Sequence, residues 1–145
     1  MAEPIPVTDL LSELNTRWNA SNVTKPQIVE RNGADAATRI DLNRADYLIG
    51  SPGSPTLEET PIGNWKYVNR SYNITIELQT KTSRQRLYDL MREVRKICHL
   101  RRHDLTNFQR LQFQNFDEDV GEQLNVWTGT LQLQVANDGV LAEIT

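Results

Sequence analysis

One stretch of the chain switches its hydrophobic period abruptly, and this switch limits the folds available to it. Over residues 72–79 apolar and polar residues alternate, which is typical of a half-buried β-strand that can begin as early as Trp65. Over 83–99 apolar residues recur every three or four positions, which indicates an amphipathic helix, and Thr82 and Gln85 fit the capping pattern at its start. Both apolar faces must be buried, so the sequence predicts a helix packed on a sheet.

The same two periods recur elsewhere in the 145 residues. Apolar residues at helical spacing predict a first helix over 7–18, and alternating residues predict strands over 111–114 and 127–135. We also expect two short strands within 27–50, around an Asn-Gly turn at 32–33. The predicted fold class is therefore α+β: one domain with a small mixed sheet of four or five strands and two main helices packed on one face.

Three segments lack a clear period. Residues 50–64 hold three prolines and three glycines, so we expect a long exposed loop there. Acidic residues over 117–122 are expected to link the last two strands, and residues 137–145 to form a flexible tail or a weak final strand.

Charge is strongly segregated along the chain, although the net charge is only −3. Residues 81–110 carry nine bases and three acids, whereas residues 111–145 carry six acids and no base. Opposite charged patches favour head-to-tail association of identical copies, and the alternative is that both blocks merely solvate one monomer. From these blocks we take as candidate interface residues Arg101, Arg102, Asp117, Glu118 and Asp119.

The outward face of the predicted strands is polar but almost uncharged. Of ten residues, Glu77 alone carries a charge. The ten residues are Asn73, Thr75, Glu77, Gln79, Gln112, Gln114, Thr128, Thr130, Gln132 and Gln134. Protein interfaces are depleted in charge, so this face is compatible with docking onto another subunit, and an ordinary solvated face is the alternative.

No pattern in the sequence indicates an active site. The chain has no glycine-rich phosphate loop and no nucleophile-elbow motif, so we expect neither enzymatic activity nor a cofactor. Cys98, the only cysteine, stands beside His99, but it falls on an apolar helical stripe among bases, which argues against a metal site. No apolar run reaches the roughly 18 residues of a membrane span, and we expect no secretory signal.

Nucleic-acid binding is a separate possibility. Bases of the 84–110 block, among them Arg92, Arg95 and Lys96, could face phosphates, as in a nucleic-acid-binding regulator. The sequence pI near 5.4 argues against this function, as does the absence of aromatic residues interleaved with these bases.

A family resemblance rests on residues 74–100, ITIELQTKTSRQRLYDLMREVRKICHL, with a basic turn, a short strand near 110–116, an acidic link and a tryptophan-containing last strand after it. Upstream, residues 39–42 and 46–49 fit as early strands. This arrangement resembles the tail-terminator or tail-completion proteins of long-tailed phages and archaeal tailed viruses.

The resemblance implies a virion structural protein at the head–tail junction, assembled in the host cytoplasm. Such subunits close into a ring, typically a hexamer, on the last ring of the tail tube protein. They stop tube polymerisation and dock to the head connector, while genomic DNA passes through the lumen without sequence recognition. Carried over to this chain, Arg84, Arg92 and Arg95 would be subunit or tube contacts, and the 50–64 loop would touch the connector or tube. Another neck protein, either a connector adaptor or a stopper, is the alternative within this class.

Overall fold

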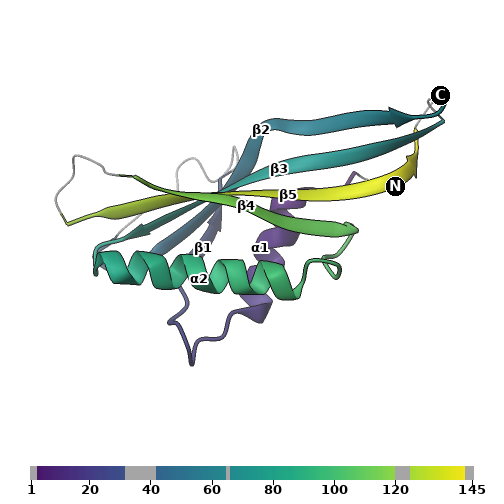
Figure 1. Ribbon diagram of the computed structural model, residues 1–145. Helices are drawn as coiled ribbons and strands as arrows, with labels where there is room; N and C mark the ends of the chain where they lie inside the picture. Colours follow the sequence, from purple (N-terminus) through teal and green to yellow (C-terminus); the bar gives the residue numbers. More distant parts are fainter. Residues whose placement is uncertain (1–2, 32–41, 65, 120–124, 143–145) are drawn as a thin grey trace.

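The computed structural model describes residues 3–31, 42–64, 66–119 and 125–142, and it has the predicted α+β fold. Its elements follow in the order α1 (Pro6–Arg17), β1 (Gln27–Glu30), β2 (Tyr47–Ile62), β3 (Tyr67–Thr80), α2 (Arg84–Leu100), β4 (Arg110–Asp119) and β5 (Trp127–Leu141). The five strands form one mixed sheet in the order β1-β2-β3-β5-β4 (Figure 1). β1 pairs with β2 in parallel, and the other three neighbouring pairs are antiparallel.

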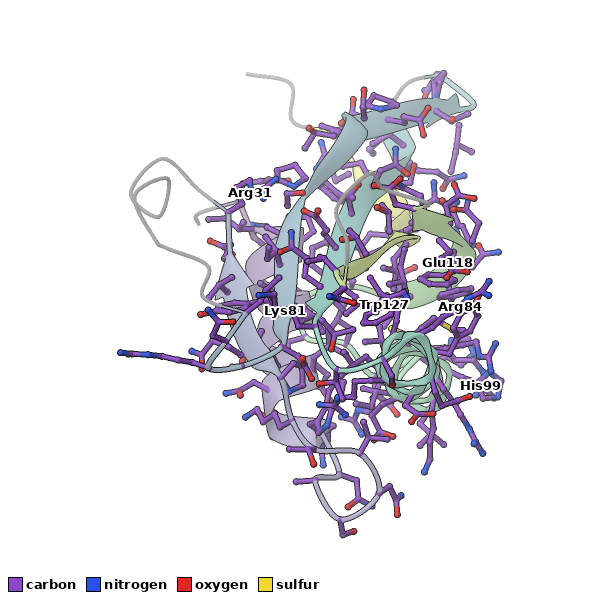
Figure 2. The ribbon with its side chains drawn as sticks, turned by 90° about the vertical axis from the view of Figure 1, so that its left-hand side faces the viewer. Arg31, Lys81, Arg84, His99, Glu118 and Trp127 are labelled. Atoms are coloured by element: carbon purple, nitrogen blue, oxygen red, sulfur yellow. The ribbon has the colours of Figure 1, made fainter. Side chains whose placement is uncertain are left out.

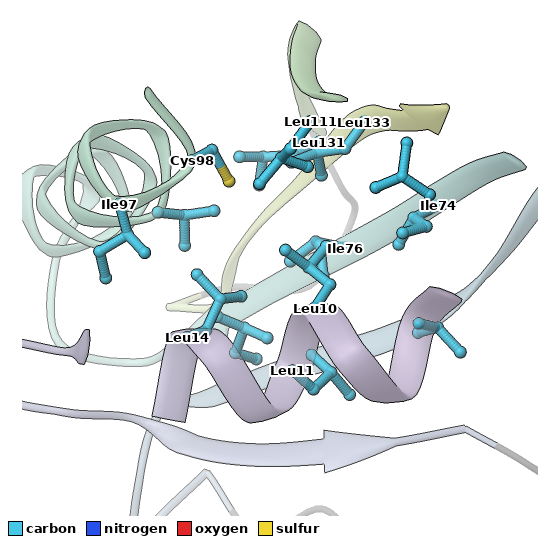
Figure 3. Close-up of a cluster of buried hydrophobic side chains, with 14 of the residues drawn as sticks. Leu10, Leu11, Leu14, Ile74, Ile76, Ile97, Cys98, Leu111, Leu131 and Leu133 are labelled. Atoms are coloured by element: carbon cyan, nitrogen blue, oxygen red, sulfur yellow. The ribbon is translucent and has the colours of Figure 1, made fainter. Parts of the chain in front are cut away.

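The hydrophobic core lies between one face of this sheet and the two helices (Figure 3). The alternating residues of β3 supply the centre of that face, beside their register partners on β5. The fully buried members on these two strands are Ile74, Ile76, Leu78, Leu131, Leu133 and Val135. Burying each such side chain contributes about 1.5–3 kcal/mol, so this contact supplies much of the driving force for folding.

Both predicted helices are confirmed, but the start of α2 differs by one residue. The cap is Ser83, whose hydroxyl accepts a hydrogen bond from the backbone N–H of Arg86 at 3.1 Å. The capping pattern that begins at Thr82 is therefore wrong. β3 continues to Thr80, whose hydroxyl accepts from the N–H of Thr82, and this turn shifts the helix start by one position. Gln85 instead donates to Asp89 along the helix at 3.0 Å.

The predicted loop over 50–64 is wrong, because residues 47–62 form the strand β2. In the described part of the chain β1 pairs only with residues 47–50, so beyond them β2 is an edge strand, which is where sheets tolerate proline. The register shifts between Pro52 and Leu57, which leaves residues 53–56 as a bulge. At Gly53 a Cβ would lie 2.7 Å from the Cβ of Asn73, so the bulge requires glycine at that position.

The last two strands are longer than predicted. Asp117–Asp119 belongs to β4 and pairs with Thr128–Thr130 of β5, so these acids are not part of a link. β5 extends to Leu141, so residues 137–141 form a paired strand rather than a flexible tail. Residues 120–122 and 143–145 lie outside the described part of the chain.

The two short strands predicted within 27–50 are confirmed in part. One is β1, and the apolar run at 47–49 opens the much longer β2. Leu42 lies in a turn, while Ile40 and the Asn-Gly turn at 32–33 fall among residues that the structure does not describe.

β2, β3 and β5 continue past both helices as a projecting three-stranded segment (Figure 1). We call residues 57–62, 66–71 and 136–142 the arm. Its six paired positions along β2 extend about 20 Å at the usual strand rise. The arm carries four exposed large apolar side chains, namely Leu57, Ile62, Tyr67 and Leu141.

The core makes a direct prediction about α2. Val94 is 0% exposed, so Val94→Asp places a carboxylate among apolar side chains. We expect the free energy of unfolding to fall by about 3–5 kcal/mol, measured by urea denaturation followed by circular dichroism. Lys96→Asp, at an exposed position of the same helix, is the control and should cost less than about 1 kcal/mol. Equal losses in the two variants would contradict this packing.

Candidate subunit interface

The exposed side of α2 carries unpaired positive charge. Arg92, Arg95 and Lys96 lie at i, i+3 and i+4, so they share one helix face opposite the buried stripe. Among the described residues, none of these three side chains has an ion pair or hydrogen bond. Arg102 follows just beyond the helix end, and its Nη1 donates to the carbonyl oxygen of His99 at 2.8 Å. We call these four cationic residues, 92, 95, 96 and 102, the basic stripe.

Two candidate residues from opposite charge blocks instead pair with each other. Arg84 binds Glu118 through two hydrogen bonds of 2.7 and 2.8 Å, and the hydroxyl of Tyr88 donates to the same carboxylate at 2.7 Å (Figure 2). The hydrogen bonds from Arg84 and then Tyr88 hold the pKa of Glu118 below its usual value. Arg84 and Glu118 therefore fasten β4 to α2 within one subunit, and sequence separation alone did not reveal this pairing.

Arg101 also forms ion pairs within the subunit. Its Nε lies 2.7 Å from Oε1 of Glu13 on α1, and its Nη1 lies 3.9 Å from Asp104. This pair joins the end of α2 to the middle of α1. The charge of Arg101 is therefore balanced by Glu13 within the same subunit.

Asp117 and Asp119 lie on the sheet face that points away from the helices. Their register partners, Thr130 and Thr128, belong to the polar outward face, and neither carboxylate has an ion pair among the described residues. The basic stripe lies on the exposed side of α2, so these basic residues and the two aspartates lie on opposite sides of the subunit. Head-to-tail contact between copies needs this separation.

The polar outward face forms one continuous surface over β3 and β5. Thr75 donates to Gln132 at 3.0 Å, and Gln134 donates to Asn73 at 3.4 Å across the strand pair. Glu77 accepts from Arg31 at 3.5 Å. The side chains satisfy one another along the strands, and the face gains the charges of Asp117 and Asp119 at its β4 edge.

The exposed apolar side chains of the arm are candidate contact residues that sequence reasoning missed. Leu57 and Ile62 fall in the segment predicted as a loop, and Leu141 in the predicted tail. Ile62, Tyr67 and Leu141 are register partners across three strands, so they form one apolar row. An unbroken alternation would have marked Leu57 and Ile62 as strand residues, but the prolines at 52, 55 and 61 interrupt it.

Cys98 is a core residue. It is 1% exposed, and burial raises the pKa of its thiol to about 12. The neighbouring His99 is exposed. In the part of the chain that the structure describes, no three His, Cys, Asp or Glu side chains gather as metal ligands would. None of the described helices has the length and apolar character that crossing a membrane requires.

The sequence matches no family model and no curated protein. The fold matches a chain from the solved structure described as the virion of a native gene transfer agent particle, with a TM-score of 0.63. The two chains are 11% identical, and the match covers 90% of this chain and 92% of the other. At this identity the likeness shows a shared fold over nearly the whole of both chains.

The Arg84–Glu118 pair predicts a dependence of stability on pH. The folded-state pKa of Glu118 is lowered, so its stabilising contribution is complete above the ordinary carboxyl pKa of about 4.3 and is lost as pH falls through the folded value. We expect the difference in unfolding free energy between wild type and Glu118→Gln to be constant near neutral pH and to shrink below about pH 4. Urea denaturation across this range measures it. A difference that does not change with pH would show that Glu118 acts without its charge.

Proposed function

We propose that this chain is a virion structural protein of the head–tail junction, and specifically a tail terminator. The observation that carries the proposal is the fold shared with a chain of the gene transfer agent virion. The resemblance of residues 74–100 to tail-terminator proteins supports the finer assignment. Within this proposal the protein is neither an enzyme nor a cofactor carrier.

The mechanism would be assembly. Copies meet head to tail, so the basic stripe of one subunit faces acidic side chains of the next, and the series closes as a ring, for which the resemblance implies six members. The closed ring sits on the last ring of the tail tube protein and covers the surface that would otherwise template growth. Its other side contacts the head connector, and DNA passes through the lumen without sequence recognition.

Two alternatives remain open to experiment. Another neck protein, such as a connector adaptor or stopper, would also form contacts between copies, but it would not cap purified tail tubes. The unpaired bases at 92, 95 and 96 also suit a nucleic-acid-binding regulator. A gel shift with duplex DNA at near-physiological salt would favour that alternative.

Assembly depends on the basic stripe in this proposal. Arg92→Glu should leave the circular dichroism spectrum and unfolding midpoint unchanged, because Arg92 is exposed and has no ion pair among the described residues. It should weaken ring formation, measured by native mass spectrometry with and without the tail tube protein.

Arg17→Glu is the control, because Arg17 is an exposed arginine on α1 outside the stripe; it pairs with Glu13 at 3.1 Å, so its unfolding midpoint is measured alongside its assembly. It should assemble as the wild type does. A wild-type protein that stays monomeric even with the tail tube protein would count against the terminator. Normal assembly by Arg92→Glu would mean that this face of α2 is only solvated.

A further inference from the structure

A small pocket lies between the C-terminal end of α2 and the first residues of β4. Its volume is about 310 Å³. Cys98, Leu111 and Phe113 form its apolar part, and Arg95, His99 and Arg102 supply its charged and ionisable groups. The pocket therefore lies within the basic stripe, so this positively charged surface also has a cavity that could receive a side chain.

The charge of this pocket sets it apart from three other hollows of the subunit. The groove between α1 and β1 has Lys25 together with Glu30, the hollow near the start of α2 has Asp46, and the hollow on the arm has Asp138. The pocket at the end of α2 has basic residues and no carboxylate. An anion therefore suits this lining, and the apolar part favours one carried on an aliphatic stem, as in a glutamate side chain.

The arm presents such a side chain. Glu58 is exposed on β2 and makes no ion pair among the described residues, whereas the next residue, Glu59, is bound to Arg70 at 2.5 Å. In the alternation of β2, Glu58 shares its face with Ile62, the first member of the apolar row Ile62–Tyr67–Leu141. This face of the arm thus combines one free carboxylate with an exposed apolar row.

The surface beside the pocket has a matching apolar residue. Leu100 ends α2 next to His99 and is 61% exposed. Of the six exposed large hydrophobic residues in the described chain, five lie on the arm or at this helix end. Both apolar and charged features of the two surfaces are therefore complementary, and the arm projects beyond its own helix layer (Figure 1).

We propose that the arm of one copy docks across the end of α2 of a second copy, with the Glu58 carboxylate in the pocket and the apolar row against Leu100. This contact rests on the proposed function, because it supplies a head-to-tail joint of the ring. It assigns Glu58, rather than Asp117 or Asp119, as the acidic partner of Arg95 in the next copy.

Charge exchange tests the pairing. Arg95→Glu and Glu58→Arg should each weaken self-association at least about tenfold, and the double variant should recover to within about threefold of wild type, measured by sedimentation. Arg95→Glu with Asp117→Arg is the matched control and should not recover. Arg95, Glu58 and Asp117 are all exposed, so circular dichroism should report an unchanged fold for every variant.

A cross-link tests proximity independently of charge. In a Cys98→Ala background, which removes the native thiol that lines the pocket, Glu58→Cys protein mixed with His99→Cys protein should form a disulfide-linked dimer under mild oxidation. His103→Cys in place of His99→Cys is the control, since the exposed His103 does not line the pocket. Equal cross-linking of the two would overturn the proposed docking.

The outcomes separate this inference from the proposed function. If the wild type assembles while the Arg95 and Glu58 variants assemble equally well, the docking is wrong and the ring proposal stands. If rescue comes from Asp117→Arg instead, the pocket has a different partner and the docking is overturned. If Arg95→Glu abolishes DNA binding but not assembly, the pocket holds a phosphate, which also overturns it. A strictly monomeric wild type would refute both proposals.

Discussion

The contact between the β3–β5 face and the two helices is the constraint on which the structure depends. Ile74, Ile76 and Leu78 must leave water together, because alternation puts all three on one side of β3. α2 follows β3 after a short turn and α1 packs beside it, so both helices cover this single face. The opposite face then receives Asn73, Thr75, Glu77 and Gln79 of β3 and becomes the outward surface.

Internal ion pairs decide which charges remain available to a partner. Arg84 is bound by Glu118 and Arg101 by Glu13, so these bases hold elements of one subunit together. These pairs are partly exposed, and their main effect here is to fix geometry and to remove charge from the outer surface. Arg92, Arg95 and Lys96 have no ion pair or hydrogen bond among the described residues, and together they leave one face of α2 positively charged.

Three strands of the sheet extend beyond the two helices, and this extension exposes surface that the helices do not cover. Strands that continue beyond the helices cannot bury both faces, so the arm exposes apolar side chains that a compact monomer would bury. Prolines at 52, 55 and 61 keep the open edge of β2 from pairing indefinitely with other strands. A projecting arm whose edge strand carries prolines suits side-chain contacts with a neighbouring molecule, and the proposed ring would use it in this way.

The sequence by itself determined the elements whose signal is local: the alternation at 72–79, the helical stripe of α2 and the first helix, and from these the α+β class. The structure alone decided that residues 50–62 belong to a strand, because proline and glycine mark turns locally, and they are tolerated here because β2 has no outer neighbour beyond residue 50 in the described part of the chain. It also decided that Arg84 meets Glu118, since 34 residues separate them and pairing depends on how β4 returns beside α2. Hydrophobic periodicity can be read from residues that are neighbours in the sequence. Sheet edges, ion pairs and pockets form only after distant segments have packed together.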